Sequence, residues 1–263
     1  MKRRFGMVTI LLTFLASISV AAVFCEDEGV KVTKVNSGYE ICEITYTLPD
    51  GCSFSCVQVC GMEDKVLQDK VNNSLTQYFS ILIEPWFLKE RIQPRAPIVH
   101  MQTDRYLSVE YIFCYITAID KRWYLCVTVD MQTGDVVFLD DLIDINEGFA
   151  ELLRTGGVIR RGEVEGIYTA EEATEQANQE YARYDTERIL RGLRQFTHKY
   201  LYGDAYEGLD RSEEWRVSMH TYLYCKFYYL EEGSFCYAES TEGLCRTRIM
   251  TEDIEEYLKV EPW

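Results

Sequence analysis

The stretch between Tyr106 and Ile143 constrains the fold of this chain more than any other. It holds three runs rich in β-branched and aromatic residues, which are Tyr106–Ile116, Trp123–Asp130 and Val136–Leu139. The breaks between these runs are short and carry Asp, Thr and Gly. Runs of this composition between turn residues are typical of strands, and short breaks join neighbouring strands antiparallel. The stretch therefore predicts a three-stranded antiparallel meander.

The region before this meander predicts further strands and a helix. Tyr39–Leu48 alternates between two faces, as a half-buried strand does, and Cys52–Cys60 follows after a Pro-Asp-Gly turn. Met62–Leu88 has apolar residues at three- and four-residue steps, which predicts a helix packed on one face. We expect a loop over Gln93–Pro97 and the next strand at Val99–Gln102.

The region after the meander is first helical and then strand-rich. Asp144 is positioned to cap a helix over Ile145–Leu153, Thr169 with Glu172 matches a capping box, and Asp185 is positioned to start another helix. The remaining expected elements are three strands and a final helix capped by Thr251, namely Trp215–Leu230, Ser234–Glu239, Leu244–Met250 and Glu252–Leu258.

These elements predict an α+β fold, with antiparallel meanders and helices packed on one face, because strands and helices are grouped apart along the chain. The chain has 263 residues, enough for a substantial core. We expect an N-terminal strand–helix subdomain over residues 39–103. A second part, 104–263, would hold the first meander, the helical middle and the second meander with its closing helix.

Residues 1–22 have the composition of a targeting segment. Basic residues precede the weakly polar run Phe5–Phe24, and Ala21 with Ala22 marks a cleavage point of a secretory signal peptide. An uncleaved membrane anchor fits the same run, because about 20 residues span a bilayer, and Cys25 offers a lipid anchor as a third alternative. Each alternative places the body of the protein outside the cytoplasm, secreted or held on the outer face of the membrane.

The charge of the chain limits its partners. The formal net charge is −16, which disfavours nucleic acid and anionic lipid. We expect no nucleic acid partner, and contact with a membrane only through the N-terminal segment. A basic partner is favoured by electrostatics, although acidity also keeps a secreted protein soluble.

The ten cysteines predict disulfides if the body lies in an oxidising compartment. Cys114 and Cys126 are equidistant from Asp120, so a symmetric hairpin would place them opposite each other and allow a bridge. The alternative is two buried free thiols. Cys52, Cys56 and Cys60 share one face of a strand, but they lack the paired zinc spacing and a clear fourth ligand.

The acidic residues near the end of the first meander are a candidate for chemistry. Paired carboxylates serve acid–base catalysis, so an envelope hydrolase that uses Asp140 and Asp141 is an alternative function. Asp residues also stabilise turns and helix N-termini without any catalytic role. The three histidines, His100, His198 and His220, lack the spacing of a zinc helix. We therefore expect no enzyme, no cofactor and no metal, with a cysteine-based metal or redox protein as a further alternative.

The tyrosines offer a different lead. The chain has 19 of them, and exposed tyrosines bind proteins and sugars through rigid, amphipathic contacts. We expect several of them to lie at least partly exposed, where a Tyr-rich patch would serve binding. The alternative is that they fill the core and its rim.

The segment Asp130–Leu142, DMQTGDVVFLDDL, resembles a motif of a known family, D-x-x-T-G-x-x-x-x-L-x-D-L. That family is an extracytoplasmic two-part domain of unknown function from Gram-positive bacteria. It occurs in the lysozyme-sensing ectodomain of an anti-sigma factor and as the N-terminal module of a peptidoglycan deacetylase. The positions that match the motif are Asp130, Thr133, Gly134, Leu139, Asp141 and Leu142.

The resemblance implies a non-catalytic binding or sensory module at the cell envelope, which recognises a protein or a cell-wall glycan. A Gly- and His-containing turn of the family is replaced here by Ala118–Arg122. We expect function to have diverged at this turn, so lysozyme binding does not carry over.

Overall fold

A computed structural model describes eight parts of the chain, residues 32–33, 38–47, 53–78, 92–115, 122–162, 168–194, 228–238 and 246–263. The expected targeting segment at 1–22 lies outside the described residues. So do 118–121 of the divergent turn and most of the expected strand Trp215–Leu230. Within the described residues, no helix is both long and apolar enough to cross a membrane.

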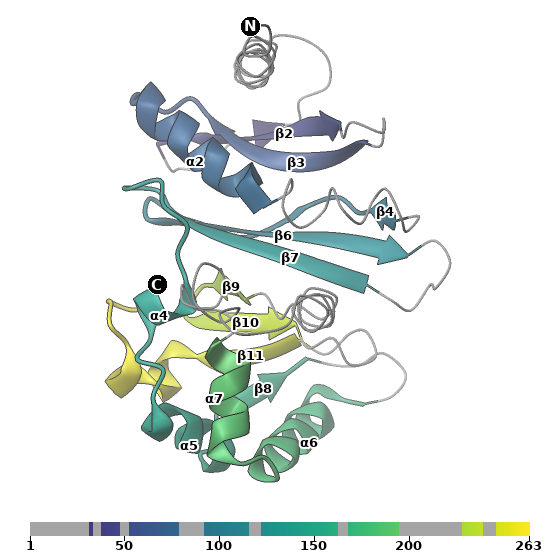
Figure 1. Cartoon of the computed structure of the whole chain (residues 1–263), viewed down its shortest axis with the longest axis vertical. Helices are drawn as coiled ribbons and strands as arrows, with labels where there is room; N and C mark the ends of the chain where they lie inside the picture. The colour runs from purple at the N-terminus through teal and green to yellow at the C-terminus, as the bar shows by residue number, and fades with distance from the viewer. Residues whose placement is uncertain are drawn as a thin grey trace, which may run out of the picture. The chain divides into compact units, whose positions relative to one another are not determined.

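The N-terminal layer is a sheet of β1 (Val32–Thr33), β2 (Glu40–Thr47) and β3 (Ser53–Cys60), in that order, in which β2 and β3 are antiparallel. Helix α2 (Lys65–Tyr78) packs against β3 (Figure 1). The helix begins later than predicted because the Asp64 carboxylate accepts the N–H groups of the first turn, at 2.9 and 3.0 Å. Such a cap satisfies N–H groups that have no partner inside the helix. The predicted strands of this region are confirmed, and so is the predicted helix over Lys65–Tyr78; its expected continuation to Leu88 lies outside the described residues.

The central sheet is organised around β6 (Tyr106–Tyr115). One edge of β6 pairs along its length with β7 (Arg122–Asp130). Its other edge pairs with β5 (Ile98–Gln102) and β4 (Ile92–Pro94), all antiparallel. Two strands of the predicted meander are therefore confirmed, and β4 lies where the sequence predicted the start of a loop.

The third predicted strand of this meander, Val136–Leu139, is wrong. Val136 makes an isolated bridge to Val129, and the chain then forms the short helix α4 (Leu139–Leu142). Asp141 Oδ2 accepts the N–H of Phe138 at 2.8 Å. This bond from a carboxylate to the residue before the helix stabilises a helical start rather than a strand.

The C-terminal sheet has the order β8-β11-β10-β9 and is antiparallel throughout. Its strands are β8 (Ile159–Arg161), β9 (Tyr228–Glu231), β10 (Ser234–Ala238) and β11 (Arg246–Met250). The second predicted meander is confirmed in β9, β10 and β11. The sequence did not predict β8, which has only three residues.

In the described residues after α4 lie the helices α5 (Glu147–Thr155), α6 (Ala170–Ala182) and α7 (Thr186–Arg194). The predicted capping box of Thr169 and Glu172 is confirmed, and Asp185 accepts an N–H of α7 at 2.7 Å. Asn146, and not Asp144, caps α5. The predicted final helix is instead two 3-10 turns, η3 (Thr251–Asp253) and η4 (Glu255–Tyr257).

The described residues form two main hydrophobic cores. One core lies between the N-terminal layer and the central sheet and includes Val57, Val71, Leu75, Leu107, Val109 and Tyr111. The other lies between the C-terminal sheet and helices α5, α6 and α7, and includes Leu139, Phe149, Ile159, Leu190, Phe235 and Ile249. Figure 1 shows these helices gathered on one side of the C-terminal sheet. The α+β prediction is therefore confirmed. The first core draws on residues from both sides of position 103, the predicted end of the first subdomain.

The predicted bridge between Cys114 and Cys126 does not form. Cys126 is a buried free thiol, and it pairs in register with Glu110, while Cys114 pairs with Arg122. The hairpin register therefore differs from the one centred on Asp120. A register is fixed by packing along the whole strand pair, so a midpoint estimated from turn composition does not determine it.

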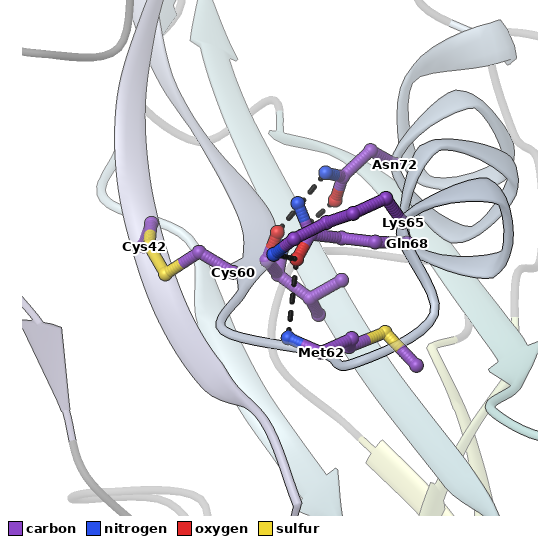
Figure 2. Close-up of a disulfide and its surroundings, with 7 residues drawn as sticks. Cys42, Cys60, Met62, Lys65, Gln68 and Asn72 are labelled. Atoms are coloured by element: carbon purple, nitrogen blue, oxygen red, sulfur yellow. Dashed lines mark hydrogen bonds between the residues drawn. A yellow bond between two sulfur atoms is a disulfide. The ribbon is translucent and has the colours of Figure 1, made fainter.

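A disulfide instead joins Cys42 on β2 to Cys60 on β3, with their Cα atoms 6.5 Å apart. Figure 2 shows this disulfide beside the loop that leads from β3 into α2. The two strands are neighbours, and the bridge connects them at the end from which α2 departs.

Candidate functional site

The motif segment folds as a turn that its own side chains stabilise. Asp130 Oδ1 accepts the N–H groups of Gln132 and Thr133 at 2.8 and 3.2 Å. The N–H of Gly134 donates to the carbonyl of Asp130 at 2.7 Å, and Gly134 has a φ of 74°, where a residue without Cβ is favoured. Asp130, Thr133 and Gly134 thus have defined structural roles in this turn.

The second half of the motif anchors the turn to the core. Leu139 and Leu142 are buried, and Asp141 accepts the N–H of Phe138. The carbonyl of Asp140 accepts a bond from Lys259 Nζ at 2.7 Å. Two motif positions therefore pack, and a third caps α4.

A groove of about 700 Å³ lies against this motif. Its polar lining comes from α2, from the start of β6 and from the motif, and includes Lys70, Asn73, Arg105, Thr133, Asp135 and Asp141. Its apolar lining consists of Val136, Val137, Phe138, Leu142 and Val260. Pockets of 300–1,000 Å³ that combine apolar walls with a few polar groups are typical ligand sites. Four of the six positions that match the motif line the groove, namely Asp130, Thr133, Asp141 and Leu142.

Two side chains of α2 connect the helix to the motif turn. Ser74 Oγ donates to the carbonyl of Gly134 at 2.6 Å, and Lys70 Nζ lies 2.7 Å from Asp135 Oδ1. The hydrogen bond from Lys70 holds the pKa of the Asp135 carboxyl below its usual value. Both groups of this ion pair are largely exposed. The pair therefore orients these two side chains at the edge of the groove more than it stabilises the fold.

The position of α2 is in turn fixed by polar contacts with β3 and the loop after it. The Asn72 side chain accepts the N–H of Val59 at 2.7 Å and donates to the carbonyl of Val59 at 3.0 Å (Figure 2). Gln68 Oε1 accepts the N–H of Met62 at 3.1 Å. These bonds set the face that α2 presents to the groove.

Arg105 connects this groove with a second hollow of about 460 Å³, lined by Arg105 and Leu258–Glu261. Arg105 Nε lies 3.8 Å from Asp130 Oδ2, and its guanidinium stands 5.2 Å from the centre of the Tyr106 ring. Its side chain is 49% exposed. Sequence reasoning missed Arg105 and Lys70, since nothing near them in the sequence marks them as partners of the motif.

A buried polar cluster joins the central and C-terminal sheets, and the sequence did not single it out. Glu110 on β6 is fully buried, and its Oε2 lies 2.9 Å from His100 Nε2 and 2.7 Å from an Arg246 nitrogen. His100 stacks on the Tyr229 ring at 3.7 Å, and its Nδ1 lies 3.5 Å from Glu231. A signal was present, because Glu110 interrupts a run of apolar strand residues.

The same cluster contains two buried thiols. Cys126 and Cys236 pack in one hydrophobic cluster with Tyr229. Burial raises the pKa of Cys236 to about 11 and raises the pKa of Cys126 as well. Raised values keep a thiol protonated and poorly nucleophilic. Within the described residues, no group of three or more His, Cys, Asp and Glu is arranged to hold a metal ion.

The tyrosines of the described part of the chain lie mainly in the core and at its rim. Several are partly exposed, namely Tyr46, Tyr124, Tyr184 and Tyr257. Of the tyrosines described there, Tyr168 is the exposed one, at 41%. Tyr106, Tyr111, Tyr228 and Tyr229 are buried. The expected histidines His198 and His220 lie outside the described residues.

Fold and groove together define an α+β protein whose mixed-charge groove is built around the motif turn. No family model matches the sequence, and no curated protein matches it. Among solved structures, the chain is similar to a member of the DUF3298 family from Bacteroides fragilis, at 12% identity and a TM-score of 0.42. The match covers 87% of this chain and 97% of that one. That neighbour is itself a domain of unknown function, and a likeness of this size carries no inference about ligand or activity.

Proposed function

We propose that this protein is a non-catalytic binding module of the bacterial cell envelope that recognises a protein or a cell-wall glycan. The observation that carries the proposal is the groove of about 700 Å³ built on the motif turn. Three separate parts of the chain supply its polar lining, as expected of a surface that contacts a ligand at several points.

The bonding of the acidic residues supports binding over catalysis. Asp130 Oδ1 accepts two backbone N–H groups and Asp141 Oδ2 accepts one. These bonds give the two carboxylates structural roles, Asp130 in the motif turn and Asp141 at the start of α4. The alternative, a hydrolase that uses Asp140 and Asp141, predicts that alanine at both positions abolishes an activity on wall material.

Two observations support a location outside the cytoplasm. The Cys42–Cys60 disulfide is typical of an oxidising compartment. The composition of residues 1–22 is that of a signal peptide or membrane anchor. Both agree with the envelope role that the motif resemblance implies.

The test is a pull-down of purified protein against isolated cell-wall sacculi and against basic proteins such as lysozyme. Alanine at Lys70 should weaken retention, because Lys70 lines the groove. Alanine at Lys65, which is exposed on the same helix outside the groove lining, should leave it unchanged. Retention no better than background for every partner would refute the proposal.

A further inference from the structure

We propose that Arg105 is the ligand-selecting residue of the groove, and that the ligand is an extended peptide with a free terminal carboxylate bound by the Arg105 guanidinium. The inference rests on the proposed function, since it names the ligand chemistry of the same groove.

Arg105 lines both the groove and the adjoining hollow, together with Val260. A ligand that occupies both spaces therefore passes the guanidinium. The two volumes, about 700 and 460 Å³, suit a short peptide better than the broad face of a folded protein, which needs a large flat interface.

The Arg105 guanidinium contacts Tyr106 and only loosely approaches Asp130. It hydrogen-bonds the Tyr106 side chain, and its Nε lies 3.8 Å from Asp130 Oδ2, longer than a hydrogen bond. The other cations of this region have shorter contacts, since Lys70 lies 2.7 Å from Asp135 and Lys259 donates to the carbonyl of Asp140 at 2.7 Å. A guanidinium has five N–H donors in a planar fork that matches a carboxylate. Arg105 is thus positioned to form a short, two-point contact with an incoming carboxylate.

Arg105 can turn from the carboxylate of Asp130 to the carboxylate of a ligand at little cost. Asp130 is held independently by the N–H groups of Gln132 and Thr133. When Arg105 turns to a ligand, Asp130 therefore keeps its hydrogen bonds and its position. The side chains of Asn73 and Thr133 are exposed on the same rim, and their amide and hydroxyl groups can pair with peptide groups.

The charge of the groove is mixed, whereas the net charge of −16 favours cations at long range. Its lining holds the carboxylates of Asp130, Asp135 and Asp141 and the cations Lys70 and Arg105. Asp135 pairs with Lys70, and Asp130 and Asp141 accept backbone N–H groups, so Arg105 is the cation of this lining that we propose for an incoming carboxylate. A peptide carboxylate can come from the peptide of a bacterial cell wall, which ends in D-alanine, or from the C-terminus of a protein, which ends in an L-residue.

The experiment uses four labelled, N-acetylated tetrapeptides, ending in D- or L-alanine, each as the free acid and as the amide. Binding to the full chain is measured by fluorescence anisotropy. We expect each bound acid to bind about tenfold or more tightly than its amide, because a charge-assisted contact is lost in the amide. Preference for the D- or the L-form then identifies the source of the peptide.

Variants isolate the role of Arg105. Arg105→Ala should weaken binding of the acid about tenfold and leave binding of the amide unchanged, and Arg105→Lys should recover only part of the loss because the fork is absent. Arg95→Ala, at an exposed arginine outside the groove lining, should change neither. Unfolding curves confirm that each variant is folded.

Equal binding of acid and amide, or full binding of the acid by Arg105→Ala, would overturn the inference and leave the binding function intact. Failure of the wild type to bind any of the four peptides would also overturn it. The proposed function would then be judged by the pull-down against sacculi and basic proteins.

Discussion

Replacing Arg246 with methionine removes the cation that faces the buried carboxylate of Glu110. The two side chains approach to 2.7 Å, and Glu110 is fully buried whereas Arg246 is 37% exposed. In the described part of the chain, Glu110 Oε1 has no hydrogen-bond partner. The variant would therefore leave a buried anion with His100 as its remaining close partner at 2.9 Å.

Breaking a buried ion pair by removing one partner costs about 3–5 kcal/mol. We expect the lower end, about 3 kcal/mol, because Arg246 is partly solvated and His100 remains in place. For a domain of this size that corresponds to a fall in Tm of roughly 6–12 °C. Urea unfolding, followed by tryptophan fluorescence, measures the change in the free energy of unfolding.

Arg248→Met is the matched control. Arg248 lies on the same strand and pairs with Glu231, but its side chain is 49% exposed. Exposed ion pairs contribute less than about 1 kcal/mol, so this variant should unfold close to the wild type.

A double-mutant cycle with Glu110→Gln separates the ion pair from other contacts of Arg246, such as its position 5.5 Å from the Tyr229 ring centre. We expect Arg246→Met to cost much less in the Glu110→Gln background, with a coupling energy of about 2 kcal/mol. Additive effects, or an Arg246→Met cost no larger than that of Arg248→Met, would show that Arg246 does not compensate the charge of Glu110.

Three further predictions concern the turn, the disulfide and a thiol. Gly134→Ala should cost about 1–2 kcal/mol by thermal unfolding, because φ is 74° and because the added Cβ would lie 3.0 Å from the Lys70 side chain. Gly157→Ala, at φ +65° with nothing within 4 Å of the added Cβ, should cost the backbone strain alone. A Gly134→Ala loss smaller than the Gly157→Ala loss would contradict the expected clash with Lys70. Alanine at both Cys42 and Cys60, 18 residues apart, should cost about 3 kcal/mol in urea, and a wild type unaffected by reductant would refute this. Burial raises the pKa of Cys236 from 9.0 to about 11. The thiol therefore ionises at lower pH in the unfolded chain than in the folded one, and the free energy of unfolding should fall as pH rises from 9 to 11. Cys236→Ala should show a smaller fall, and a pH profile identical to that of the wild type would count against a buried thiol at this position.

Most elements of the fold were readable from the sequence because their signals are local. Alternation of side chains identified β2, and the capping box at Thr169 identified the start of α6. The errors in cysteine pairing arose where packing along two paired strands decides the register. Cys126 pairs with Glu110 and not with Cys114, since the register depends on packing along both strands. For the same reason, the partner of Cys42 was not predicted.

The motif Asp130–Leu142 shows the same division within the candidate site. Its turn is stabilised by hydrogen bonds between residues at most a few positions apart, so the sequence alone located it. The groove also needs Lys70 and Arg105, which the sequence did not connect with the motif. Side chains so far apart along the chain meet only when the core forms.

The sequence by itself determined the α+β class, most of the strands and the turn of the Asp130–Leu142 motif, because periodicity and short-range hydrogen bonds are encoded in neighbouring residues. Only the tertiary structure decided the β6–β7 register, the Cys42–Cys60 bridge and the burial of Glu110 beside Arg246. It also decided which charged side chains line the groove. Burial and long-range pairing depend on how whole layers pack, and that packing is a property of the assembled core rather than of any single stretch of the chain.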